Sequence, residues 1–341
     1  MDIKSLLREN IRNLAPYSTA RDEYEGDIGI YLDANENPYD NGYNRYPDPR
    51  QKELKRVISE LKGIPVENIF IGNGSDEPID LAFRMFCDPG IHNAVSIAPT
   101  YGMYKVAAAI NGVEMREVRL GDDFSLDAGA LLAAADQNTR LMFICSPNNP
   151  SANSFPAADI ERVIREFQGI VVLDEAYIDF AEQEGFLRRL AEFPNLIILQ
   201  TLSKAWGMAG LRLGLAFADT FIVEVMSRVK YPYNINVVTQ KLVMEQLARP
   251  VDAQVREVIE QRKRIVSAMA AMPVVKKVYP SDANFVLIKV DEPRKIYNLL
   301  IDAGIIVRDR SRIHGCEGTL RITVGTPEEN DRLLTILAGL K

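Results

Sequence analysis

The sequence contains few of the residues on which disulfide-rich and metal-binding proteins depend. Among its 341 residues are three cysteines and two histidines. The cysteines, at 87, 145 and 316, are scattered and odd in number, which argues against a disulfide framework and favours a reducing, cytoplasmic location. No zinc-type spacing occurs, and two histidines are too few for a metal site. We therefore expect no structural metal.

Long apolar runs and an excess of basic residues are also missing. No uninterrupted apolar stretch approaches the roughly 20 residues that a membrane helix requires, and the charged first ten residues do not resemble a signal peptide. The net charge of −7 argues against nucleic acid as the main partner. The G-x-G-x-x-G pattern that opens a helix after the first strand of a Rossmann dehydrogenase is absent, so that class is excluded.

Helical and extended patterns alternate over the first two thirds of the chain. The length suggests two domains, and a hydrophobic content of 47% supplies ample material for their cores. Amphipathic helices are predicted at 51–62, 77–86, 103–111, 157–167 and 239–247. Between them lie apolar strands that begin near Ile69, Ala94, Val113, Leu141, Ile170, Leu196 and Leu213. This alternation is typical of an α/β domain with a mostly parallel sheet, here of seven strands, covered by helices.

The last third of the chain has a different pattern. Residues 253–270 form one long amphipathic repeat, and short strands near Lys276, Asn284 and Leu320 follow it, with a helix at 294–303. This pattern indicates a smaller α+β domain, which we expect the N-terminal arm to join.

The chain is therefore divided into three parts. We predict an N-terminal arm (1–30), a large domain (31–245) and a small C-terminal domain (246–341). The loop of Lys204 and the strand of Arg321 would then face each other across the cleft between the two domains.

A lysine follows the apolar run 195–199. Lys204 is preceded by Ser203, and Arg212 comes eight residues later in a stretch with three glycines. A lysine amine can condense with an aldehyde once its pKa is lowered, whereas serine, glycine backbone and arginine suit a phosphate monoester. An aldehyde and a phosphate together indicate pyridoxal 5′-phosphate. The same motif taken alone also occurs in ordinary surface loops.

A carboxylate and a phenol end the apolar run 169–177. Asp174 lies at the carboxyl end of a strand, where open α/β sheets place their ligands. It would keep the pyridine nitrogen of the cofactor protonated, and Tyr177 would donate a hydrogen bond to the phenolic oxygen. The alternative is a helix N-cap aspartate beside a packed tyrosine.

Three further loops also follow apolar strands. Asn149 precedes a proline, which favours an extended backbone and leaves the amide to share the phenolic oxygen. Gly74, Ser75 and Asp76 lie between a strand and a helix start, where free N–H groups bind anions or the serine caps the helix. Tyr101 offers a flat ring for stacking. Each is also explained by an ordinary loop, but together the five loops supply every contact that the cofactor needs.

This set of loops resembles the fold-type-I PLP-dependent aminotransferases, and in particular the histidinol-phosphate aminotransferase family. The finer resemblance rests on segments that generic aminotransferases do not share, at residues 12–17, 32–38, 44–49, 230–236, 304–309 and 320–326. It covers nearly the whole chain. It implies a fold-type-I PLP-dependent transferase, with the large and small domains described above.

The resemblance also implies a role for each site residue. Catalysis is expected of Lys204, which carries the cofactor and moves a proton, together with Asp174 and Tyr177. A second set would hold the ring and phosphate of the cofactor: Gly74, Ser75, Asp76, Tyr101, Asn149, Ser203, Arg212 and, from the other subunit of a homodimer, Tyr46. A third set would bind the substrates, with Arg321 on the carboxylate of the amino-acid co-substrate and Arg308, Tyr17 and Asn35 on the phosphate-bearing substrate.

The implied reaction converts L-histidinol phosphate and 2-oxoglutarate to imidazole acetol phosphate and L-glutamate, in histidine biosynthesis. An aromatic amino acid aminotransferase or a threonine-phosphate decarboxylase on the same fold is the nearest alternative. A PLP-binding regulatory module is more remote, because the chain is acidic.

One segment departs from the family pattern, in which the Asn-Pro pair is followed by Thr-Gly. Here Ser151 and Ala152 follow it. Alanine adopts a positive φ less readily than glycine, so we expect a reshaped loop after Asn149, with the amide itself retained.

Overall fold

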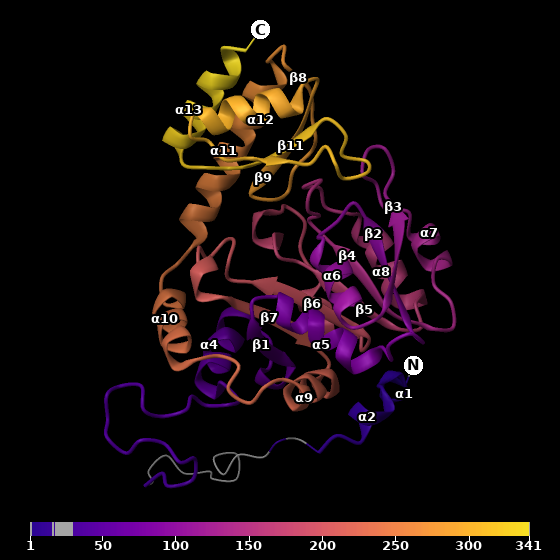
Figure 1. The fold of residues 1–341 in the computed structure, drawn as a ribbon, viewed down its shortest axis with the longest axis vertical. Helices are drawn as coiled ribbons and strands as arrows, with labels where there is room; N and C mark the ends of the chain where they lie inside the picture. The colour runs from indigo at the N-terminus through magenta and orange to yellow at the C-terminus, as the bar shows by residue number, and fades with distance from the viewer. Residues whose placement is uncertain (1, 16, 18–29, 341) are drawn as a thin grey trace.

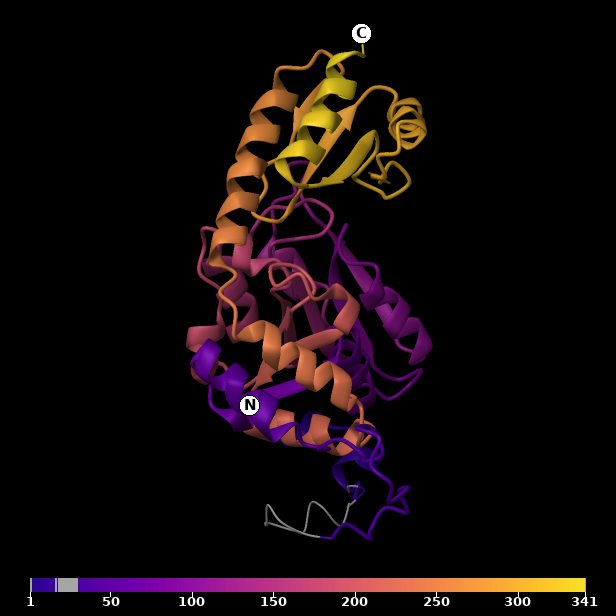
Figure 2. The same cartoon turned by 90° about the vertical axis from the view of Figure 1, so that its left-hand side faces the viewer.

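The computed structural model describes residues 2–15, 17 and 30–340, and these form two bodies, each built on its own sheet. Figure 1 shows the smaller body stacked on the larger along the long axis of the molecule. The long helix α11 (Asp252–Ala270) rises from one into the other, which is clearest in Figure 2.

The larger body contains a seven-stranded sheet in the order β1-β7-β6-β5-β4-β2-β3. The strands are β1 (Ile69–Asn73), β2 (Asn93–Ala98), β3 (Glu114–Arg119), β4 (Thr139–Cys145), β5 (Ile170–Asp174), β6 (Leu196–Thr201) and β7 (Leu213–Ala218). Only β7 runs antiparallel to its neighbours. Every residue of β5, β6 and β7 is buried, because helices cover both faces of the sheet. The predicted mostly parallel, seven-stranded sheet is therefore confirmed.

Helices cover the two faces of this sheet and form two separate cores. One core lies beneath the helices α4 (Lys52–Lys62), α7 (Ala128–Ala133), α8 (Ala157–Glu166) and α10 (Val237–Leu247). The other lies beneath α5 (Asp76–Phe86), α6 (Met103–Ile110) and α9 (Thr220–Val229). Because both faces are sealed, the exposed carboxyl ends of the parallel strands are left as the natural place for a ligand.

The N-terminal helices belong to the larger body. Ile3 in α1 (Ile3–Leu6), Leu7, and Ile11 in α2 (Glu9–Arg12) are buried in the core beneath α5 and α9. Arg8 adds an ion pair with Asp88 at 2.9 Å. The expectation that this arm joins the small domain is therefore wrong, because its apolar side chains match the face of the large sheet. The divisions after residues 30 and 245 stay predictions.

The smaller body is an antiparallel sheet covered by helices on one face. Its strand order is β10-β11-β9-β8, with the bounds Arg308–Asp309, Thr319–Thr323, Phe285–Val290 and Val275–Val278. The covering helices are α11, α12 (Pro293–Asp302) and α13 (Pro327–Ala338). The alternation of side chains along β9 and β11 sends one set into this core and the other toward the larger body.

The face of the small sheet that points toward the larger body forms part of the seam between the two. Phe285 of β9 packs edge-on against Tyr177, with the ring centroids 5.1 Å apart. Leu287, two residues further along, packs in a cluster with Phe124 of the larger body. These contacts place the small sheet directly over the carboxyl end of β5.

No helix in the described part of the chain has the length and apolar character needed to cross a bilayer.

Candidate active site

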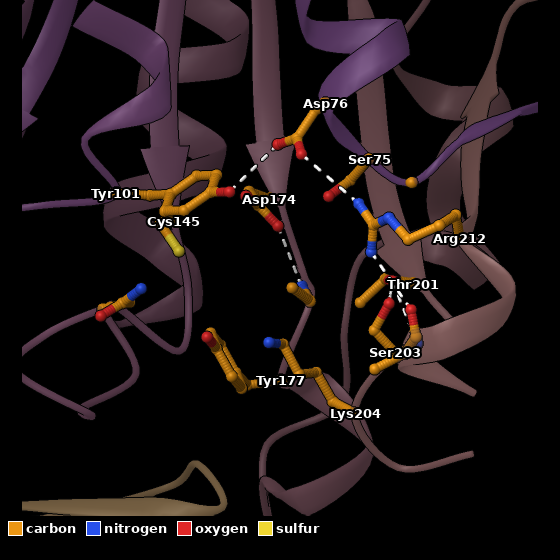
Figure 3. A pocket seen from close by; sticks show the side chains of 14 residues that line it. Ser75, Asp76, Tyr101, Cys145, Asp174, Tyr177, Thr201, Ser203, Lys204 and Arg212 are labelled. Atoms are coloured by element: carbon orange, nitrogen blue, oxygen red, sulfur yellow. Dashed lines mark hydrogen bonds and ion pairs between the residues drawn. The ribbon is translucent and has the colours of Figure 1, made fainter. Parts of the chain in front are cut away.

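A pocket opens at the carboxyl ends of β4, β5 and β6, beside the loop that follows β1 (Figure 3). Ten of the residues expected to hold a cofactor line it: Gly74, Ser75, Asp76, Tyr101, Asn149, Asp174, Tyr177, Ser203, Lys204 and Arg212. Segments that are more than 130 residues apart in the sequence therefore meet in one cavity, as the strand-end argument requires.

Lys204 occupies a tight loop between β6 and β7. Backbone hydrogen bonds fix the loop, from Met208 N–H to Leu202 O at 2.9 Å and from Gly207 N–H to Lys204 O at 3.2 Å. The amine points into the pocket and lies 5.5 Å from the ring centroid of Tyr177. Burial lowers the pKa of this amine below its ordinary value, and the positive charge of Arg321 lowers it further. A lowered pKa makes the neutral, nucleophilic form of the amine easier to reach.

Asp174 is the last residue of β5 and is almost completely buried. Its Oδ1 accepts a hydrogen bond from the Ala176 N–H at 3.0 Å, and its Oδ2 accepts one from the Tyr104 hydroxyl at 2.6 Å. Burial raises the pKa of the carboxyl group, whereas these two hydrogen bonds lower it. Burial is the largest of these effects and the pKa is raised overall, so a cation facing Asp174 would favour its carboxylate form.

A second carboxylate joins the two sides of the pocket. Asp76 accepts a hydrogen bond from the Tyr101 hydroxyl at 3.0 Å, and its other oxygen lies 3.6 Å from Arg212 Nη2. Burial raises the pKa of the Tyr101 phenol, and the neighbouring Asp76 raises it further, so the hydroxyl stays a donor. These contacts fix the ring of Tyr101 at one edge of the cavity and the guanidinium at the other (Figure 3).

The backbone around Gly74 leaves a concave space suited to an anion. Gly74 has φ +70°, and a Cβ at this position would lie 2.6 Å from Arg212 Nη2. A Cβ at Gly214 would lie 2.2 Å from the backbone of Gly74 and Ser75. Only glycine permits this close approach of β7 to the loop. The sequence therefore keeps the space between the loop and the guanidinium free of side chains.

Hydrogen-bond donors surround that space. Ser75 is the N-terminal boundary residue of α5, but its side chain makes no capping hydrogen bond, so the simple helix-cap alternative is not what this serine does. The N-terminus of this eleven-residue helix lines the pocket, and Arg212 adds a positive charge. The hydroxyls of Thr201 and Ser203 lie 3.0 Å apart on the same side. This donor set matches a phosphate monoester.

The side chain of Asn149 is held by a hydrogen bond from the small sheet. Its Oδ1 accepts a hydrogen bond from Arg321 Nη1 at 2.5 Å, so its amide N–H groups are left to face the pocket beside Tyr177. Burial raises the pKa of the Tyr177 phenol. Two neutral donors, an amide and a phenol, therefore stand together at one side of the cavity.

The loop after Asn149 contains the departure from the family pattern. Ala152 has φ +71° and is fully buried. Its N–H donates to Asn148 O at 2.8 Å, and its carbonyl accepts from the Asp282 N–H at 2.7 Å. The alanine thus adopts the left-handed conformation that glycine adopts more readily, and hydrogen bonds from its N–H and to its carbonyl hold it there.

The residues expected to bind the substrates do not line this pocket. Arg308 of β10 lies directly opposite Arg321 of β11, so the two arginines share the sheet face that points toward the larger body. Tyr17 lines a separate cavity beside Lys55, and Asn35 is exposed. Tyr46 is half-exposed and stacks on Tyr233, with the ring centroids 4.4 Å apart.

Reasoning from sequence missed several residues of the site. Four further residues line the pocket: Cys145, Ala176, Thr201 and Ala209. Tyr104 lies outside the lining and donates a hydrogen bond to Asp174. The nearness of Tyr104 to Tyr101 in the sequence was a usable signal, because the two rings meet edge-on with centroids 5.6 Å apart where α6 begins. Arg310, two residues after Arg308, was also missed; its Nε is buried and has no hydrogen-bond partner within the described ranges.

The fold and this donor set define a class of protein. Residues 31–337 match the family model "Aminotransferase class I and II", which spans nearly the whole chain. The chain therefore belongs to the class I and II aminotransferase family. A solved structure of histidinol-phosphate aminotransferase from Sinorhizobium meliloti in complex with pyridoxal-5′-phosphate has a TM-score of 0.79 and 25% identity to it, over 86% of this chain and 82% of that one.

Relatives with a higher sequence identity to this chain narrow the choice within the family. The histidinol-phosphate aminotransferase of Parabacteroides distasonis is 52% identical over 100% of this chain and 99% of that protein. The histidinol-phosphate aminotransferase of Cytophaga hutchinsonii is 50% identical over 98% of both chains. The similarity is therefore continuous from end to end and is not limited to the cofactor loops.

Proposed function

We propose that this chain is a histidinol-phosphate transaminase of histidine biosynthesis. It would convert L-histidinol phosphate and 2-oxoglutarate to imidazole acetol phosphate and L-glutamate, with pyridoxal 5′-phosphate as cofactor. The single observation that carries the proposal is the pocket itself, in which a partly desolvated lysine, a buried carboxylate and an anion cradle face one another. Relatives of that name at half identity over the full length support the choice of substrate.

The residues of the pocket fit the cofactor group by group. The cradle formed by Gly74, Ser75, Ser203 and Arg212 would hold the phosphate, since a Cβ at Gly74 would intrude on the space in front of Arg212. Asp174 would pair with the ring nitrogen. Asn149 and Tyr177 would donate to the phenolic oxygen, Tyr101 would lie against the ring, and Asp76 would position Tyr101 and Arg212 through the contacts described above.

The chemistry then divides between the cofactor and the chain. Pyridoxal 5′-phosphate, when bound, supplies an aldehyde that takes up the amino group and a ring that spreads negative charge from the substrate carbon. Lys204 Nζ would take the proton from that carbon and deliver it to the former aldehyde carbon of the cofactor, and the lowered pKa of the amine favours the neutral form that can accept this proton. The Asp174 carboxylate would hold the proton on the ring nitrogen throughout.

The two arginines of the small sheet would recognise the substrates. Arg321 donates a hydrogen bond to Asn149, which lines the pocket. Its guanidinium is therefore placed to bind the carboxylate of glutamate or 2-oxoglutarate. Arg308 lies beside it, and its side chain is exposed, so it would meet the phosphate of histidinol phosphate together with Tyr17 and Asn35. Because Tyr17 and Asn35 lie outside the pocket in a single chain, this half of the site would be completed on assembly.

We further propose that the enzyme is a homodimer in the cytoplasm. Tyr46 would reach the cofactor phosphate of the other subunit, which accords with its exposure and its distance from this chain's own pocket lining. A reducing compartment accords with three cysteines that are all unpaired and buried.

Steady-state rates with three amino donors test the substrate assignment. Histidinol phosphate should give a kcat/KM at least about a hundredfold above those of phenylalanine and threonine phosphate, because only it presents a phosphate together with an uncharged ring. Equal or higher values for phenylalanine would assign the enzyme to the aromatic aminotransferases. Release of carbon dioxide from threonine phosphate would assign it to the decarboxylases.

A further inference from the structure

A buried tyrosine outside the pocket lining contacts the carboxylate at its centre. Tyr104 lies in α6 and is 1% exposed, and its hydroxyl donates to Asp174 Oδ2 at 2.6 Å. The other oxygen of Asp174 accepts the Ala176 N–H. Each carboxylate oxygen therefore accepts a hydrogen bond from the protein, one from the backbone N–H of Ala176 and one from the hydroxyl of Tyr104 in α6.

The ring of Tyr104 is fixed on two sides. It stacks on Phe143 of β4, with the centroids 4.9 Å apart, and meets the ring of Tyr101 edge-on at 5.6 Å. Burial raises the pKa of its phenol well above the usual value, and the charge of Asp174 adds to this effect. The hydroxyl therefore remains a donor at physiological pH, and it donates to Asp174 with the Cys145 thiol beside it.

Neighbouring side chains show that packing alone does not require this hydroxyl. Phe83, Phe143 and Tyr104 form a continuous row, since Phe83 stacks on Phe143 at 5.3 Å and Phe143 stacks on Tyr104. Two of the three rings carry no polar atom. The hydroxyl occurs only at the end of the row that reaches Asp174, where a phenylalanine would fill the same volume but leave one carboxylate oxygen without a donor.

We propose that Tyr104 is a positioning residue that keeps the Asp174 carboxylate ionised and oriented toward the ring nitrogen of the cofactor. The inference rests on the role proposed above for Asp174. A buried carboxylate loses its charge unless donors stabilise it, and a charge-assisted O–H···O⁻ bond of this length is among the stronger ones available. Tyr104 also contacts Tyr101. This one residue would therefore support both Asp174, the proposed partner of the ring nitrogen, and Tyr101, which would stack on the ring.

The test removes the hydroxyl and asks whether the loss depends on the ring nitrogen. Tyr104→Phe keeps the ring and its stacking on Phe143. Dissociation constants are measured by fluorescence titration for pyridoxal 5′-phosphate and for its carbocyclic analogue, in which carbon replaces the ring nitrogen. Tyr279→Phe is the matched control, because Tyr279 is a similarly buried tyrosine in a different cluster, beside Phe124. Thermal melting of each variant reports whether its fold is retained.

The expected result is a selective loss. Tyr104→Phe should weaken pyridoxal 5′-phosphate about tenfold to a hundredfold, the range for a hydrogen bond to a charged group, and should change binding of the analogue less than about threefold. The kcat for histidinol phosphate should fall by a similar factor with KM nearly unchanged, because Tyr104 does not line the pocket. Tyr279→Phe should leave all of these values as in the wild type.

Two results would overturn the inference while leaving the proposed function intact. Equal weakening of cofactor and analogue would mean that Tyr104 acts through packing, and unchanged binding of both would mean that its hydroxyl has no role. A wild-type protein that fails to prefer the cofactor over the analogue would instead refute the role of Asp174, and this inference with it.

Discussion

The two halves of the candidate site are built in different ways. The proposed cofactor half comes mainly from loops at the ends of neighbouring strands in one sheet, and all of its proposed residues except Tyr46 line one pocket of a single chain. The proposed substrate half comprises Arg308 and Arg321 from the small sheet and Tyr17 and Asn35 from the N-terminal part of the chain. Among these four, Arg321 hydrogen-bonds to Asn149 of the pocket lining, whereas Tyr17 and Asn35 lie outside that lining.

This difference shows what each half demands of the fold. Hydrogen bonds between strands fix the ends of β4, β5 and β6 relative to one another, so loops there place chemical groups with little freedom. The substrate half crosses the seam between two sheets and, on our proposal, an interface between two subunits. Substitutions of pocket-lining residues should therefore act within a single chain, whereas those in the second half and at Tyr46 should depend on domain arrangement and assembly.

The largest effect is expected at Lys204. Lys204→Ala should lower the single-turnover rate by at least about 10⁴-fold, because it removes both the amine that carries the cofactor and the group that moves the proton. Rapid-mixing absorbance with histidinol phosphate measures this rate. Lys241→Ala, which changes an exposed lysine on α10, is the control and should be unaffected. Transamination at the wild-type rate by Lys204→Ala would contradict the mechanism.

Mixed dimers test whether the site is shared between subunits. Tyr46→Ala and Lys204→Ala would each be nearly inactive alone. If Tyr46 acts across the interface, a mixed dimer of the two carries one intact site and one doubly altered site. Refolding an equimolar mixture should then restore about a quarter of the wild-type activity by random pairing. Recovery of no activity above the sum of the parents would place Tyr46 in its own subunit's site or outside catalysis.

A smaller and more selective effect is expected at Arg308. Arg308→Gln should raise KM for histidinol phosphate about tenfold to a hundredfold, because a charge-assisted contact to the phosphate is lost, and should leave KM for 2-oxoglutarate within about twofold. Arg312→Gln, an exposed arginine four residues further on, is the control. If both KM values rise together, Arg308 would support the small sheet generally and would not select the phosphate.

The smallest effect concerns Glu175, which adjoins Asp174 but points away from the pocket. Its carboxylate accepts from the Phe186 N–H at 2.7 Å and from Gln200 Nε2 at 3.0 Å, and burial raises its pKa to about 7. Because the pKa of Glu175 is higher in the folded state, the protonated carboxyl stabilises the fold. This contribution is complete below the unfolded-state pKa of about 4.5 and is lost as the pH rises through about 7.

Glu175→Gln should therefore be more stable than the wild type at pH 8, by about 1–3 kcal/mol, and nearly equal to it at pH 4.5. The amide of Gln200 can turn to accept from the new N–H group, since its Oε1 is buried and has no partner in the described part of the protein. Thermal melting at the two pH values measures the difference. A variant that is less stable at pH 8 would show that the charged form of Glu175 is required.

The same division decides how much could be predicted from the sequence. Apolar runs and helical periodicity located all seven strands of the large sheet and the helices α4, α5, α6, α8 and α10, because each element is continuous in sequence. The cofactor residues follow from these strands by a simple rule about strand ends. Helices α9 and α13 were missed; each begins at a cap, Asp219 and Thr326, that was not recognised as a helix start.

Other features could not be predicted because they arise from long-range contacts. The packing of α1 and α2 depends on which sheet offers a complementary apolar face, and periodicity does not record this. The contact between Tyr104 and Asp174 joins residues 70 positions apart. The left-handed conformation of Ala152 is held by Asn148 and Asp282, the second of which lies far along the chain.

The most direct test of the central claim is the absorbance spectrum of the purified protein, reconstituted with pyridoxal 5′-phosphate. The account predicts a band near the edge of the visible range that collapses when L-histidinol phosphate is added and returns when 2-oxoglutarate follows. A band that ignores histidinol phosphate would contradict the proposed substrate. Absence of any band after reconstitution would contradict the assignment of Lys204 and, with it, the account of the whole site.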